Sequence, residues 1–316
     1  MDYVFCVRSV RSGEFSNEPG ATHFLAVPEN SGRTEPGQAI RKRDWVAAVL
    51  EEASSGDHPG EAKGDIVFYV HGFNNSRQVM LERHRKIRAG LERNGFEGVV
   101  ISFDWPSADS ALNYLEDRTD AKQTAFRLVD EGIRSFAALQ TPSCRINMHV
   151  LAHSMGCYVV REAFDDADDR PAVAAQSWSV SQIMFVAADV SQSSLNGDNP
   201  KSSSLYRHCV RLTNYYNPLD NVLSIANVKR VGVAPRAGRV GLPDAPPGKA
   251  VDLYCGAYYR AHEDDFDLDP ITSAHRFYFD DPRFLEDVFH CVNGQLDRHE
   301  FPTRLPTDQG NLALRP

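Results

Sequence analysis

Two patterns of apolar and polar residues alternate along this chain. Short runs in which nearly every residue is apolar, such as 65–70 (DIVFYV) and 98–103 (GVVISF), are typical of strands buried on both faces. Between them lies a longer stretch, 78–94, with the spacing of an amphipathic helix. Because apolar strands alternate with helices, we predict an α/β fold with a mostly parallel central sheet and helices on both faces.

The same alternation continues along most of the chain. Further strands are expected at 3–10, 22–27, 146–152, 181–189, 208–216 and 250–255, and further helices at 43–52, 110–139, directly after Ser154, and at 282–291. A turn is expected at 16–20 (SNEPG).

Domain organisation follows from the lack of a break between two strand–helix series. We predict a single domain over 1–293, in which 1–60 supply the N-terminal strands and a helix. The segment 229–249, rich in Gly, Pro and Arg, is predicted to be a long loop, and 294–316 a C-terminal tail.

Composition narrows the class of protein. Apolar residues make up 42% and charged residues 24%, as in ordinary globular proteins. The 34 basic residues against 43 acidic ones give a net charge of −9, which disfavours nucleic acid as a partner. No apolar run is long enough to cross a bilayer, and the first residues alternate like a strand rather than a secretory signal. The six cysteines form no CxxC pair, so we expect buried free thiols in a reducing cytoplasm.

The clearest chemical motif is 151–156 (LAHSMG), which follows a buried strand and opens a helix. This is the setting of a nucleophile elbow, in which Ser154 sits on a tight strand-to-helix turn. The turn brings backbones close together, so small residues are needed two positions away on each side, and Ala152 and Gly156 occupy those positions. The N-terminus of the helix directs its amides at the serine, where negative charge develops during acyl transfer.

A second motif, 71–75 (HGFNN), lies at the end of another buried strand. With it, the chain resembles an α/β-hydrolase, and specifically an uncharacterised bacterial family of serine esterase-like and lipase-like α/β-hydrolases. The likeness spans roughly 60–292 and is carried by YVHGFN (69–74), SFDWPS (102–107), LAHSMG (151–156), VAAD (186–189), NPLDNVL (217–223) and SAHRFYF (273–279). It implies an α/β-hydrolase fold, a serine nucleophile, and an oxyanion hole formed by the backbone N–H groups of Phe73 and Met155.

A serine nucleophile needs a histidine base, and the base needs an orienting acid. In this fold the order along the chain is serine, acid, histidine. Two acids compete for the middle role, because Asp189 ends the first expected strand after the serine and Asp220 follows the next one. We favour Asp220, because it follows the strand that most often supplies the acid in this fold; Asp189 remains the alternative.

Four histidines follow Asp220 in the chain, of which His290 falls within the expected last helix and His299 in the tail, so His262 and His275 are compared. His275 lies shortly before the last helix, where the catalytic histidine belongs, whereas carboxylates beside His262 favour its charged form and make it a poorer base. We therefore favour His275 as the base. One histidine with adjacent acids is a weak ligand set, so we expect no metal site and no cofactor.

These residues predict a hydrolase that cleaves a carboxylic ester through an acyl-enzyme on Ser154. The alternatives are an acyltransferase or amidase on the same three residues, or a binding module that keeps the fold without the chemistry. The expected partner is a small-molecule ester or acyl compound, and the oligomeric state is not indicated. Trp105 follows a strand end, where it is expected either to form a wall of the substrate pocket or to lie in the core.

Overall fold

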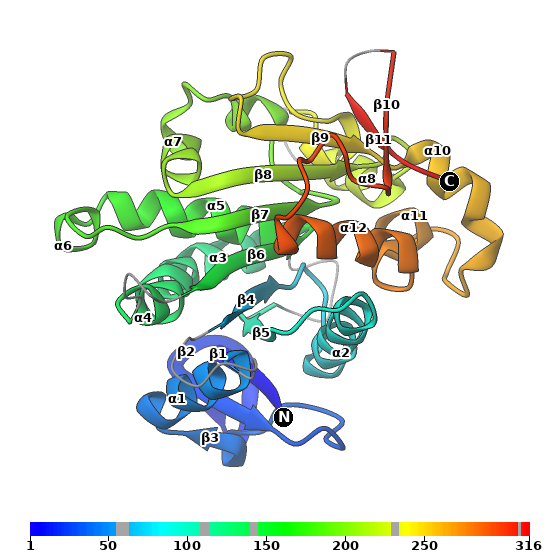
Figure 1. The fold of residues 1–316 in the computed structure, drawn as a ribbon. Helices are drawn as coiled ribbons and strands as arrows, with labels where there is room; N and C mark the ends of the chain where they lie inside the picture. Colours follow the sequence, from blue (N-terminus) through cyan, green and yellow to red (C-terminus); the bar gives the residue numbers. More distant parts are fainter. Residues whose placement is uncertain (55–62, 108–113, 140–144, 229–233, 309–310) are drawn as a thin grey trace.

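A single sheet runs through the whole molecule in the computed structural model, which describes residues 1–54, 63–107, 114–139, 145–228, 234–308 and 311–316 (Figure 1). Its eleven strands lie in the order β10-β11-β9-β8-β7-β6-β4-β5-β1-β2-β3. The eight strands in the middle of this order, β11 to β1, pair parallel with their neighbours. At the edges, β10 pairs antiparallel with β11, β2 with β1, and β3 with β2. The strands are β1 (Asp2–Arg11), β2 (Glu14–Val27), β3 (Ala39–Ile40), β4 (Lys63–Val70), β5 (Val99–Asp104), β6 (Arg145–His153), β7 (Val180–Val186), β8 (Cys209–Tyr216), β9 (Ala250–Tyr254), β10 (Arg304–Pro306) and β11 (Leu312–Leu314).

Helices cover both faces of this sheet, as predicted (Figure 1). Consecutive residues of β4 show why its sequence is a continuous apolar run. Phe68 belongs to the apolar cluster on one face and Tyr69 to the cluster on the other, and both are fully buried. The first cluster takes in α1 (Lys42–Ala53), α3 (Tyr114–Arg127), α5 (Met155–Asp168) and α7 (Pro200–Arg207), and the second α2 (Arg77–Arg93), α10 (Gly256–His262) and α12 (Pro282–Asn293). A π-helical segment (Leu128–Ile133) and α4 (Arg134–Ala137) extend α3, and α6 (Pro171–Ala174) follows α5.

The N-terminal hairpin turns at a different place from the one expected. The chain reverses at Ser12 and Gly13, whose φ angles of 51° and 82° are those of a tight left-handed turn. Strand β2 then runs through 16–20, where Pro19 pairs with Arg8 and the register shifts on either side. The turn-rich composition of this segment therefore marks bulges in an edge region of the sheet.

The C-terminal residues also differ from expectation. Instead of an appendage, 294–316 contribute two strands to the sheet, with Leu312 of β11 paired to Leu253 of β9. Arg304 is inserted into the interior, where its side chain has no exposed surface and its guanidinium lies 2.7 Å from a carboxylate oxygen of Asp287. These residues are part of the same sheet.

The predicted long loop 229–249 is only partly a loop. Residues 229–233 lie outside the described part of the chain, and α9 (Ala237–Val240) follows them. Ala237 donates its backbone N–H to Val190 at 2.9 Å, so this segment packs at the carboxyl end of β7, beside the candidate site. No helix among the described residues is long and apolar enough to cross a membrane.

Candidate functional site

Ser154 lies between β6 and α5 on a strained turn. Its φ of 56° and ψ of −123° are unfavourable for a residue with a side chain. The backbone is held there by its neighbours: the N–H of Ser154 donates to Val186, and its carbonyl accepts from Asp189. The Ser154 side chain makes no capping hydrogen bond to α5, so the hydroxyl remains available for chemistry.

The close approach expected at this turn is present. A Cβ atom on Gly156 would lie 2.3 Å from the carbonyl oxygen of Val70, so no larger residue fits there. A Cβ atom on Gly72 would lie 2.8 Å from the Cβ atom of Ser154. The segment after β4 therefore packs directly against the elbow, which brings Phe73 and Met155, the two expected oxyanion donors, onto neighbouring pieces of backbone.

Asp220 and His275 are joined directly. The Nδ1 atom of His275 lies 2.6 Å from Oδ2 of Asp220, and both side chains are buried. The other oxygen, Oδ1, accepts the backbone N–H of Leu223 at 3.0 Å, in the first turn of α8 (Asn221–Val228). The Asp220 carboxylate thus caps the N-terminus of α8 with one oxygen and orients the imidazole of His275 with the other. His275 itself sits in a four-residue helix, α11 (Ser273–Arg276).

His153 connects this histidine to the elbow. Its Nε2 atom lies 2.8 Å from the backbone carbonyl of His275, and the two rings are 4.7 Å apart between centroids. Burial and the nearby His275 hold the pKa of His153 well below its usual range, so the ring is neutral and Nε2 carries the proton that it donates. In the described chain the hydroxyl of Ser154 makes no hydrogen bond to His275. Such contacts are often loose before a substrate binds.

The alternative acid has a different partner. Asp189 forms an ion pair with Arg236, whose Nε atom lies 3.1 Å from Oδ1 of the carboxylate, and both side chains are about 95% buried. The alternative histidine, His262, lies on α10, where its Nδ1 atom is 2.9 Å from the carbonyl of Tyr258. Neither residue takes part in the Asp220–His275 pair.

A buried polar network lies at the carboxyl ends of β4 and β5, beside the segment that carries Gly72 and Phe73. Asp104, at the end of β5, accepts a hydrogen bond from Nε of Arg8 at 2.8 Å and lies 3.3 Å from Nε2 of His71. Burial alone would raise the pKa of this carboxyl, but Arg8 and His71 together lower it to about 2. The sequence did not predict this network, and its available signal was an acid at the carboxyl end of a strand, in the SFDWPS segment.

Trp105 belongs to the same network. It has no exposed surface, its ring stacks on His71 with centroids 5.3 Å apart, and its Nε1–H donates to the carbonyl of His71 at 2.8 Å. This burial favours the core alternative for Trp105 over a pocket wall. The tryptophan helps to fix the segment from which Gly72 and Phe73 extend.

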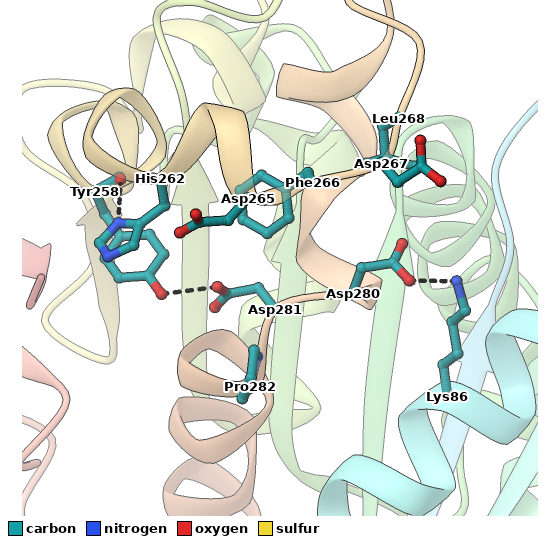
Figure 2. Close-up of a pocket in the computed structure, with 10 residues that line it drawn as sticks. All are labelled: Lys86, Tyr258, His262, Asp265, Phe266, Asp267, Leu268, Asp280, Asp281 and Pro282. Carbon is teal, nitrogen blue, oxygen red and sulfur yellow. Dashed lines mark hydrogen bonds and ion pairs between the residues drawn. The ribbon is translucent and has the colours of Figure 1, made fainter.

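A cavity of about 600 Å³ lies between α2, α10 and the start of α12 (Figure 2). Its wall contains His262 and several carboxylates. Among them, Asp281 accepts a hydrogen bond from the Tyr258 hydroxyl at 2.7 Å, and Asp280 pairs with Lys86. No group of three or more His, Cys, Asp or Glu side chains in the described ranges is arranged to hold a metal ion.

Comparisons with known proteins point to one family. The model of a family described as "alpha/beta hydrolase of unknown function (DUF900)" matches residues 50–250. No curated protein matches the chain.

Similar solved structures include three bacterial or metagenomic hydrolases. A structure of the metagenome-derived lipolytic enzymes LipS and LipT is 12% identical, with a TM-score of 0.37 over 73% of this chain and 94% of that one. Esterase B from Lactobacillus rhamnosis is 12% identical, with a TM-score of 0.36 over 75% and 80%. The RedJ thioesterase from Streptomyces coelicolor is 13% identical, with a TM-score of 0.33 over 72% and 90%. With TM-scores below 0.5, these likenesses say nothing about what this chain acts on.

Proposed function

The chain belongs to this family of α/β-hydrolases, which confirms the fold expected from its motifs, and we propose that it is a serine hydrolase that cleaves a carboxylic ester. The observation that carries the proposal is the strained elbow of Ser154, whose neighbour His153 contacts His275, a histidine hydrogen-bonded to the buried Asp220. A serine on such a turn, in a fold that also holds an imidazole–carboxylate pair, is the arrangement expected of an acyl-transfer site.

In the proposed reaction, Ser154 attacks the carbonyl carbon of the ester while Nε2 of His275 accepts the hydroxyl proton. Asp220 holds Nδ1 of the ring in the protonated tautomer and stabilises the imidazolium that forms. His275 then gives its proton to the leaving alcohol, and the acyl group stays on Ser154. A water molecule, deprotonated by the same histidine, releases the acid and restores the serine.

The oxyanion of the tetrahedral intermediates is assigned to the backbone N–H groups of Phe73 and Met155. Met155 is the first residue of α5, where the amide N–H has no partner within the helix and the helix dipole favours negative charge. Phe73 follows Gly72, whose Cα approaches Ser154 too closely for any side chain. The ester carbonyl would therefore lie between the elbow and the segment after β4.

The test is labelling by a fluorophosphonate probe combined with turnover of a panel of 4-nitrophenyl esters. We expect wild-type protein to be labelled and to release 4-nitrophenol, and Ser154→Ala to do neither. Ser191→Ala is the matched control, because Ser191 is a partly exposed serine beyond the end of β7. Labelling of Ser154→Ala at the wild-type rate would overturn the proposal, and labelling of the wild type without turnover of any ester would favour an acyltransferase or amidase.

A further inference from the structure

Most basic side chains in the middle of α2 have carboxylate partners. Arg85 and Arg88 both pair with Asp2 at 2.8 Å, and Lys86 pairs with Asp280 across the cavity wall (Figure 2). These three cations are all partly exposed. Their charges are thus offset by both water and carboxylates.

Arg83 lies on the same stretch of helix and is different. Only 7% of its surface is exposed, yet it forms no ion pair with any carboxylate in the described ranges. Its Nη1 atom donates to the side-chain oxygen of Asn75 at 2.8 Å, and its guanidinium lies 4.7 Å from the ring centre of Phe279. A buried cation whose partners are neutral is costly, because amides and aromatic rings offset its lost hydration only in part.

A second guanidinium with no carboxylate contact lies nearby. Arg276 directly follows His275 in α11, is partly buried, and makes no hydrogen bond or ion pair within the part of the chain that is described. Burial lowers the pKa of Arg276, the positive charge of Arg83 lowers it further, and the exposed carboxylate of Asp269 opposes both. Phe279, whose ring lies under the guanidinium of Arg83, is three residues after Arg276, so the two arginines lie on adjoining parts of the structure.

Arg83 is connected to the candidate site through its contacts, and Arg276 through the chain, because it directly follows His275. Asn75, the partner of Arg83, donates its side-chain N–H to the carbonyl of Gly72 at 2.8 Å, next to the assigned oxyanion donor. The ring of Phe279, under the same guanidinium, meets His153 edge-on at 5.0 Å. Arg83 thus lies between the segment after β4 and Phe279, and Arg276 lies on the segment that carries the histidine.

We propose that the substrate carries an anionic group, a carboxylate or a phosphate, that Arg276 binds beside the reacting ester. Arg83 supplies a second positive charge from the interior behind it. The planar guanidinium of arginine binds both kinds of anion through paired hydrogen bonds. An anion placed here would offset two positive charges that no carboxylate contacts in the described part of the chain, which a neutral substrate cannot do. That the bound anion is part of a substrate rests on the proposed function, whereas the anion site itself rests on the two arginines.

The first experiment compares two esters that differ by one carboxylate: mono(4-nitrophenyl) glutarate and 4-nitrophenyl valerate. We expect kcat/KM of the wild type to be at least about tenfold higher for the glutarate. In Arg276→Gln the ratio of the two kcat/KM values should fall about tenfold, and in Arg276→Lys by less, because lysine keeps the charge without the planar fork. Arg260→Gln removes an exposed positive charge from α10 and is the control for net charge; it should keep the wild-type ratio.

The second experiment needs no turnover. Calorimetric titration of the wild type and of Arg276→Gln with glutarate and with glycerol 3-phosphate measures anion binding directly. Tighter binding of either anion by the wild type than by Arg276→Gln supports the site and identifies its preferred anion as a carboxylate or a phosphate. Equal binding in the two proteins, or none in either, overturns it. If the fluorophosphonate probe fails to label Ser154 while Arg276-dependent binding is found, the proposed hydrolase function falls and the anion site stands.

Discussion

At the scale of single residues, the two aspartates that the sequence left open have different partners. Asp220→Asn should lower kcat about 10³- to 10⁴-fold, because an amide at this position favours the wrong tautomer of His275. Asp189→Asn should instead lower the free energy of unfolding by about 3 kcal/mol, because it weakens a buried ion pair with Arg236. Steady-state kinetics and urea unfolding of both variants measure the two effects. Loss of turnover in Asp189→Asn with normal turnover in Asp220→Asn would exchange the roles.

His153 directly precedes Ser154 in the chain, but its contacts do not indicate a catalytic role. Its Nε2–H supports the backbone of His275, so we class it as a positioning residue. His153→Phe keeps an aromatic ring but loses the donor, and we expect kcat to fall about tenfold with little change in KM. His153→Gln keeps an N–H donor and should recover most of the loss. If both variants lower only the melting temperature, with unchanged kcat per labelled serine, the role is structural.

At the scale of elements, the length of an element decided whether the sequence predicted it. Buried strands such as 65–70 and helices such as 78–94 have enough residues for their apolar period to be visible. Strands β10 and β11 have three residues each, too few for alternation. The helix α11 is also short, with four residues, so His275 was assigned through its place in the chain order and not through its element.

The packing of these short C-terminal strands can be tested through Arg304. Arg304→Met leaves the fully buried carboxylate of Asp287 without its guanidinium, and we expect the free energy of unfolding to fall by about 3–5 kcal/mol. Adding Asp287→Asn to the same protein should recover part of this loss, because no buried charge then remains. Chemical denaturation measures both. A single variant within about 0.5 kcal/mol of the wild type would mean that 294–316 contribute little to the domain.

At the scale of the whole molecule, contacts between distant segments set the limit of what the sequence could predict. Motif order was enough to propose Ser154, Asp220 and His275, because the fold fixes the succession of its loops. The same reasoning could not pair Arg8 with Asp104, 96 positions apart, since that contact depends on which strands become neighbours. Nor could it show that Arg83 is buried away from carboxylates, which is a property of the folded interior.

The free energy of unfolding is a property of the whole molecule, and we expect the buried carboxyl of Asp252 to make it depend on pH. Asp252 of β9 accepts hydrogen bonds from the Asn214 side chain and the Leu242 backbone, both at 2.7 Å, and so links two strands to the segment after α9. Burial raises its pKa from 3.8 to about 6, although both hydrogen bonds oppose the shift. Between these two pH values the folded protein therefore holds a proton that the unfolded chain has lost.

The sign of the effect follows from this difference. When the folded state binds more protons, the free energy of unfolding falls as pH rises, so the Asp252 contribution should be lost between about pH 4 and pH 6, by about 3 kcal/mol at most. Asp252→Asn cannot titrate. Its unfolding free energy, relative to the wild type, should accordingly rise across this range and level off above it. Urea unfolding at a series of pH values measures the difference, with Asp244→Asn, an exposed carboxylate in the same segment, as the control for removing one negative charge. A difference that stays constant with pH, or that falls as pH rises, would show that Asp252 is not the buried acid described here.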